Sequence, residues 1–142
     1  MAHKRILVAT DLSPASDKVV GAAIALAAEL GADMWALNVL TEESVRRMRA
    51  DLPEEAAYVD TLVERVRDEV ADQVRRLGGV IVAATVERGE PGEAVHKAGT
   101  DLESDLIVIG VRNRSRVGKL ILGSATQEIL LNAPCPVLSV PI

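Results

Sequence analysis

The segment 110–126 has the residue types and spacing that bind phosphate. It contains four cations within eight residues: Arg112, Arg114, Arg116 and Lys119. No acid occurs in residues 106–127, although the chain as a whole has 21 Asp and Glu against 16 Lys and Arg and a formal net charge of −5. Positive charge that no neighbouring carboxylate cancels attracts anions. Gly110, Gly118 and Gly123 allow close approaches to the backbone that side chains would block.

A helix start at the end of this segment adds a second phosphate-binding feature. Gly123 and Ser124 stand where a helix over 124–132 is predicted to begin. The free N–H groups and positive dipole end of a helix favour an anion. The hydroxyls of Ser124 and Thr126 supply further donors. The alternative is an ordinary helix start beside unrelated surface arginines. The segment is no P-loop, since Leu120 follows the Gly-Lys pair, and the chain contains no GxGxxG fingerprint.

Asp11 is a candidate for the same site. It follows the apolar run 5–10, which predicts a buried strand, just as the basic segment follows the apolar run 105–111. Ligands of open α/β sheets bind beyond the carboxyl ends of strands, where the strand order reverses. If these two strands are neighbours, Thr10, Asp11 and Gly110 face one cleft. The alternative for Asp11 is a carboxylate that the dipole of the next helix stabilises.

Strand and helix patterns alternate along the whole chain. The predicted strands are 5–10, 33–40, 80–89, 105–111 and 136–142. The predicted helices are one from Pro14 to Leu30 with Ser13 as N-cap, a short helix or flap over 42–52, a long one opening at Pro53, one within 90–102 and one over 124–132. This order predicts a single α/β domain over 1–142, with a doubly wound, open parallel sheet and helices on both faces.

The longest predicted helix has one apolar stripe and one charged face. The stripe consists of Val59, Val63, Val66, Val70, Val74 and Leu77 at helical spacing. The opposite face is charged, and Asp72 is placed to pair with Arg76 one turn later. We interpret this face as solvated and without a function of its own.

Composition excludes several classes of protein. The acidic balance and the near absence of aromatic residues argue against nucleic-acid binding. No uncharged run is long enough to cross a bilayer, and the N-terminal apolar run is too short for a secretory signal. The single cysteine, Cys135, is interpreted as a small buried apolar residue rather than a reactive thiol. We therefore expect a soluble, cytoplasmic protein.

The sequence contains no evident catalytic group. His3 lies at the N-terminus and His96 on a predicted helix away from the basic segment, so both are interpreted as surface or satisfied residues. No Ser-His-Asp or Cys-His pair and no cluster of metal ligands stands out. An efficient enzyme is not expected.

The spacing of the basic segment resembles a known family signature. Gly110-x2-Asn113-x9-Gly123-Ser124 is similar to G-x2-G-x9-G-[S/T] of the universal stress protein family, with Asn113 in place of the second glycine. Three further stretches extend the resemblance over essentially the whole chain: RILVATDLSPAS (5–16), ALNVL (36–40) and LGSATQEILLNAPCPVLSV (122–140). Asn tolerates a left-handed backbone better than most residues, so the turn is expected to survive.

The resemblance implies a fold and a ligand. The fold is a five-stranded sheet of order 3-2-1-4-5, and the ligand is ATP, accompanied by Mg²⁺ or Mn²⁺ held through its phosphates. By position, Asp11 next to Thr10 would contact the nucleoside, Val39 would offer its backbone to adenine, and Ile109 and Gly110 would border the ribose. The phosphates would be held by Arg112, Asn113, Gly123, Ser124, Ala125 and Thr126.

The implied function is a regulatory, nucleotide-dependent switch in the stress response, with closure of the 111–122 loop over the phosphates as the switching element. The resemblance also implies a homodimer through the edge strand 136–142, in which Pro141 limits the pairing, and a downstream protein partner that the sequence does not identify. Two alternatives stay open. The first is a dimeric interaction protein that binds no nucleotide, which Asn113 favours, and the second is a weak ATPase.

Overall fold

A single parallel sheet organises the chain. The computed structural model describes residues 4–54, 58–112 and 121–142. The strands are β1 Arg5–Ala9, β2 Asp33–Leu40, β3 Ala83–Arg88, β4 Leu106–Val111 and β5 Val137–Pro141. The helices are α1 Ser16–Leu30, α2 Glu42–Ala50, α3 Val59–Arg76, α4 Pro91–Asp101 and α5 Ser124–Asn132.

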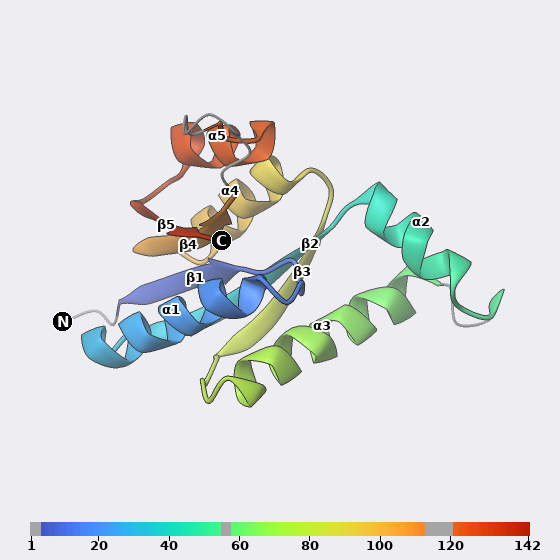
Figure 1. Ribbon diagram of the computed structural model, residues 1–142, viewed down its shortest axis with the longest axis horizontal. Helices are drawn as coiled ribbons and strands as arrows, with labels where there is room; N and C mark the ends of the chain where they lie inside the picture. The colour runs from blue at the N-terminus through green and yellow to red at the C-terminus, as the bar shows by residue number, and fades with distance from the viewer. Residues whose placement is uncertain (1–3, 55–57, 113–120) are drawn as a thin grey trace.

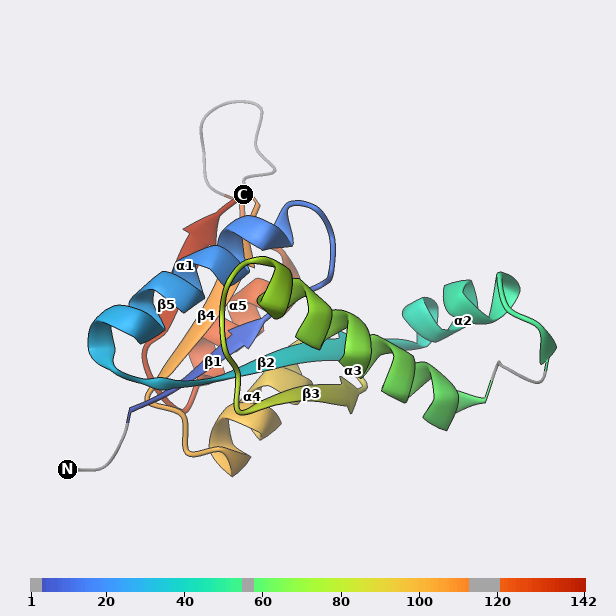
Figure 2. The ribbon, with the colours of Figure 1, turned by 90° about the horizontal axis from the view of Figure 1, so that it is seen from below.

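The strand order is β3-β2-β1-β4-β5, and every pair is parallel. Helices α1 and α3 cover one face and α4 and α5 the other (Figure 1). Figure 2 looks onto the α1–α3 face and shows α2 set apart beyond the carboxyl end of β2. The predicted fold class and strand order are confirmed.

The central strands are buried on both faces. Ile6 and Val8 of β1 belong to the core beneath α1 and α3, whereas Leu7 between them belongs to the core beneath α4 and α5. Val108 and Ile107 of the neighbouring β4 divide in the same way. Because successive side chains of a strand point to opposite faces, a continuous apolar run fills both cores at once.

Several predicted boundaries shift. The third strand begins at Ala83 rather than at residue 80, because Gly79 still packs against the end of α3 through its N–H bond to Val74 O (2.9 Å). The other strands match to within one residue at each end. Of the two readings of 42–52, the short helix is confirmed: Thr41 Oγ1 accepts from the N–H of Ser44 (3.1 Å) and caps α2.

The predicted starts of two helices are wrong. Helix α1 begins at Ser16, not Pro14, and has no side-chain cap hydrogen bond. The N–H of Ser13 instead bonds to Asp11 Oδ1 (2.9 Å), and Ser13 O accepts from Ser16 Oγ (2.6 Å), so these groups close a turn before the helix. The long helix α3 begins at Val59 rather than Pro53.

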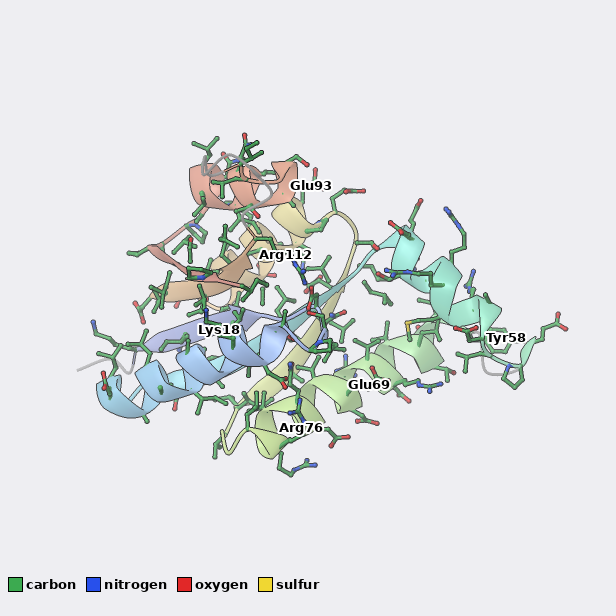
Figure 3. The ribbon with its side chains drawn as sticks, viewed as in Figure 1. Lys18, Tyr58, Glu69, Arg76, Glu93 and Arg112 are labelled. Carbon is green, nitrogen blue, oxygen red and sulfur yellow. The ribbon has the colours of Figure 1, made fainter. Side chains whose placement is uncertain are left out.

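The charged face of α3 is solvated as predicted, since Glu64, Arg67, Asp68, Asp72, Arg75 and Arg76 are all exposed. Gln73 lies three residues after Val70 and seven after Val66, on the apolar side of α3, and is only 4% exposed. Arg76 bonds to Asp17 of α1, with its two terminal nitrogens 3.0 and 2.8 Å from the carboxylate oxygens, and Figure 3 shows Arg76 extending toward α1. Asp72 pairs with Arg75 at 2.7 Å instead of with Arg76. The predicted pairing of Asp72 with Arg76 is therefore wrong, although both side chains are exposed as expected.

Within the described residues, no helix is long and apolar enough to span a membrane.

Candidate functional site

A cleft of about 680 Å³ opens at the carboxyl ends of β1, β2 and β4. This edge is where the strand order reverses, since β1 lies between β2 and β4. The predicted site residues that line the cleft are Thr10, Asp11, Val39, Ile109, Gly110, Arg112, Gly123, Ser124, Ala125 and Thr126. The remaining one, Asn113, lies outside the described residues, as do Arg114, Arg116 and Lys119. Asp11 and Arg112, the first cation of the basic segment, thus line one cleft, and the prediction that the rest of the segment faces it stays a prediction.

Asp11 lies in the turn between β1 and α1, exposed to solvent. Its Oδ1 accepts from the N–H of Ser13, which fixes the carboxylate without neutralising it. The next residue, Leu12, has a left-handed backbone (φ 62°), which is costly for a residue with a branched side chain. The N–H of Leu12 bonds to Thr10 Oγ1 (3.1 Å), which helps to hold this conformation. Asp11 is thus presented to the cleft by an ordered turn.

Gly110 has a packing reason to be glycine. A Cβ at this position would stand 2.8 Å from Val19 Cγ2 and 3.0 Å from Ile142 Cδ1. Val19 is a core residue of α1, and Ile142 follows the last strand. The absent side chain of Gly110 therefore lets α1 and the C-terminus close over the end of β4.

Gly123 has no such packing reason to be glycine among the described residues. No atom of the described chain lies within 4 Å of a Cβ placed there, and the backbone of Gly123 (φ −65°, ψ 160°) suits any residue. Gly123 is the N-cap of α5, no side chain caps it, and no acid lies in the first turn. The first helical backbone bond runs from Gln127 N to Gly123 O (3.0 Å), so the N–H groups before Gln127 precede the helical ladder. This helix end can accept an anion.

The charges of the cleft come from three elements. Within the described part of the chain, the charged lining residues are Asp11 beyond β1, Arg47 of α2 and Arg112 beyond β4. Figure 3 labels Arg112, which lies where β4 leaves the sheet. Two guanidinium groups against one carboxylate give the described lining a positive balance inside an acidic protein.

Sequence reasoning missed the contribution of α2 and of Asn38. Thr41, Ser44 and Arg47 line the cleft because α2 begins directly after β2, at the same edge of the sheet. Asn38 is 8% exposed, and its Nδ2 donates to Thr10 O (2.9 Å). A polar residue inside the apolar run of the second strand was the signal that could have marked Asn38.

The other candidate groups lie away from this cleft. His96 Nδ1 lies 2.7 Å from Asn132 O, which confirms that it is a satisfied histidine joining α4 to α5. Cys135 is partly buried, and burial, with a smaller effect from Asp105, raises the pKa of its thiol, so it stays protonated. Among the described residues, no three His, Cys, Asp or Glu side chains form a group that could hold a metal ion.

An open, doubly wound parallel sheet with a charged cleft at its switch point defines an α/β protein whose candidate ligand site lies at this edge. The chain belongs to the universal stress protein family, because the model of that family matches residues 2–141. This membership agrees with the signature noted in the sequence.

Individual relatives support the assignment. Universal stress protein MJ0531 of Methanocaldococcus jannaschii is 27% identical over 143 residues, which cover 97% of this chain and 82% of the relative. The solved structure of protein MJ0577 has a TM-score of 0.74 at 22% identity and covers 100% of this chain and 98% of its own. A crystal structure of a universal stress protein in complex with cAMP has a TM-score of 0.67 at 19% identity, covering 99% and 98%. At these identities the structures show a common fold.

Proposed function

We propose that this protein binds an adenine nucleotide, specifically ATP, in the cleft between β1 and β4, and acts as a nucleotide-dependent regulatory switch in the stress response. The observation that carries the proposal is the convergence of Asp11, Val39, Gly110 and the N-terminus of α5 on one cleft. A volume of about 680 Å³ lies within the range of small-molecule sites.

The residues that line the cleft suit the different parts of a nucleotide. The uncapped first turn of α5 offers N–H groups and the hydroxyls of Ser124 and Thr126 to phosphates, and Arg112 adds positive charge. The half-buried Val39, the next-to-last residue of β2, also lines the cleft and offers an apolar surface with backbone groups to a base. Asp11 lines the same cleft, and a carboxylate can accept from ribose hydroxyls.

A divalent ion would be held mainly by the phosphates. Asp11 is the one carboxylate that lines the cleft within the described residues, and Ser124 and Thr126 supply neutral oxygens. Mg²⁺ keeps several waters and is commonly bound through one or two protein oxygens together with phosphates, so this donor set fits it. When bound, the ion would neutralise phosphate charge next to Arg112.

A structural neighbour was solved with cAMP, an adenine nucleotide. Its fold is shared with this chain, which supports the class of ligand proposed here. The preference for ATP over a monophosphate depends on how many phosphates the helix end and the basic segment hold. The segment 113–120, including Asn113 and most of the proposed 111–122 switching loop, lies outside the described residues.

The direct experiment uses the weak absorbance of the protein. With one Trp and one Tyr, co-purified nucleotide would dominate the ultraviolet spectrum of the purified protein. Nucleotide-free protein should then gain thermal stability with ATP and Mg²⁺, and less with AMP. A clean protein spectrum together with no thermal shift on adding ATP and Mg²⁺ would sink the nucleotide proposal.

We also propose a homodimer through the edge strand 136–142, which is the basis of the second candidate function, a dimeric interaction protein. Within the described chain β5 pairs only with β4. Ile107 N bonds to Pro136 O and Ile142 N bonds to Val111 O (both 3.0 Å). The backbone N–H and C=O groups of the even-numbered residues of β5 therefore point toward β4. Because these groups alternate along a strand, the backbone groups of Val137, Ser139 and Pro141 point toward the open edge of the sheet.

The open edge is blocked at one end. Pro141 has no N–H, and its carbonyl already accepts from Lys18 Nζ (2.6 Å). Pairing with a second copy would therefore centre on Ser139. Leu131 of α5 and Leu138 of β5 are exposed apolar residues, 82% and 39% exposed, and such surface favours association.

A further inference from the structure

A buried amide joins α3 to the turn that carries Asp11. Gln73 Oε1 accepts from Thr10 Oγ1 (2.7 Å), and Gln73 Nε2 donates to Ser16 Oγ (2.8 Å) and to Asp17 Oδ1 (2.9 Å). Gln73 therefore contacts the residues at both ends of the segment 10–17. It does not line the cleft.

The hydrogen bonds have a fixed direction. Thr10 donates its hydroxyl proton to Gln73, which leaves Thr10 Oγ1 as the acceptor for the N–H of Leu12. At the other end Ser16 accepts from Gln73 and donates its own proton to Ser13 O (2.6 Å). An amide supplies the acceptor and the donor at once, which neither a carboxylate nor an apolar side chain does.

The hydrogen bonds among Gln73, Thr10, Ser16 and Asp17 form an array, and its outer end, at Asp17, is charged. Asp17 receives bonds from Gln73 and from both terminal nitrogens of Arg76, which lies on α3 three residues after Gln73. In the described contacts, the charged groups at Gln73 are thus Asp17 from α1 and, beyond it, Arg76 from its own helix. No charged group from the sheet contacts Gln73 within these residues.

We propose that Gln73 is a positioning residue for nucleotide binding: from the opposite side of the turn it fixes Thr10, Leu12 and Ser16, and so sets where the Asp11 carboxylate stands in the cleft. The inference rests on the proposed function, because it concerns the same site. Asp11 lies between two residues that the array holds, and Leu12 has a left-handed backbone that needs such support. Loosening the array frees the carboxylate from its binding geometry.

The test uses Gln73→Glu and Gln73→Met with the full-length protein. At pH 7.5 the introduced carboxylate has no proton to give to Ser16 and stands beside Asp17, so ATP should bind at least about tenfold more weakly than to wild type. On protonation near pH 5.5 the side chain regains one donor and one acceptor, and the ratio of its affinity to that of wild type should rise. Gln73→Met should be weak at both pH values. Taking each ratio at the same pH cancels the titration of ATP itself.

A second readout separates this inference from the proposed function. Amide hydrogen exchange at Leu12 and Ser13 should be faster in Gln73→Met than in wild type, whether or not nucleotide binds, measured below the melting onset of each variant. Glu64→Gln, on the exposed face of α3, should change neither exchange nor affinity. If wild type binds no nucleotide, the proposed function fails while faster exchange still supports the positioning of the turn. Wild-type exchange in Gln73→Met, or an affinity ratio for Gln73→Glu that stays flat with pH, overturns the inference.

Discussion

Substitution by alanine should affect two glycines of the same cleft differently: it should lower stability at Gly110 and ATP affinity at Gly123. In Gly110→Ala the new Cβ would approach Val19 Cγ2 to 2.8 Å and Ile142 Cδ1 to 3.0 Å. Val19 is 1% exposed and β-branched, so it has little freedom to move aside. Overpacking of this kind costs about 1–3 kcal/mol, offset by about 0.4–1 kcal/mol from the stiffer unfolded chain. We expect a net loss of about 1–2 kcal/mol, which lowers the melting temperature by about 3–8 °C.

Gly123→Ala should leave stability almost unchanged. Its Cβ meets no atom of residues 4–54, 58–112 or 121–142 within 4 Å, and its backbone is allowed for alanine. Alanine is a poorer N-cap than glycine by roughly 0.5–1 kcal/mol, and the unfolded-state gain of about 0.4–1 kcal/mol offsets this. The methyl group would stand where phosphate approaches the helix end. ATP affinity should therefore fall at least about tenfold, or about 1.4 kcal/mol.

Thermal melting in the absence of nucleotide and calorimetric titration with ATP and Mg²⁺ separate the two effects. Gly110→Ala should move the melting temperature far more than Gly123→Ala, and Gly123→Ala should lose the larger share of ATP binding. Equal melting temperatures for the two variants would refute the packing argument for Gly110. An unchanged ATP affinity in Gly123→Ala, with wild type binding, would refute the role of the α5 N-terminus.

Two further results are expected. The hydrogen bonds from Arg76 and then from Gln73 lower the pKa of Asp17 from 3.8 to about 2. Because the pKa in the folded state is the lower one, the stabilisation is present above about pH 4 and is lost as the pH falls toward about 2. In Asp17→Asn the urea midpoint of unfolding should therefore depend less on pH between about 2 and 4. The same pH dependence as in wild type would contradict the assignment. Ser139→Pro removes the central N–H of the open edge but none facing β4, so sedimentation should show a monomer with unchanged circular dichroism, and a surviving dimer would place the interface elsewhere.

The sheet and the cleft could be predicted from sequence because local patterns determine them. Apolar runs the length of a strand alternate with helical stripes, and that order admits few topologies. The strand order itself came from the family resemblance. Once β1 and β4 are neighbours, Asp11 and Gly110 must share one edge of the sheet, and the cleft contains both.

Features that depend on contacts between distant segments were not predictable in this way. Gln73 lies 63 residues from Thr10 and 57 from Ser16. Its spacing from Val66 and Val70 places it on the apolar side of α3, but the sequence of the helix does not show which polar groups it meets there. Arg76 had an acid at helical spacing, Asp72, yet its partner is Asp17, 59 residues away. The start of α1 was wrong for a local reason, because residues 11–16 form a turn in which Ser13 O accepts from the N–H and the hydroxyl of Ser16.

Comparing Gly110 with Gly123 indicates which part of the signature points to a ligand. Gly110 is required by the packing of Val19 and Ile142, so a chain that bound nothing would still need it. Gly123 has an ordinary backbone and a Cβ direction that is open in the described part of the chain, so no described contact requires glycine there. A side chain at the N-cap would instead stabilise α5, since Ser, Asp and Asn are better N-caps than glycine. A ligand that approaches the helix end would give a reason to leave this position bare, so Gly123 supports the proposed nucleotide binding more strongly than Gly110 does.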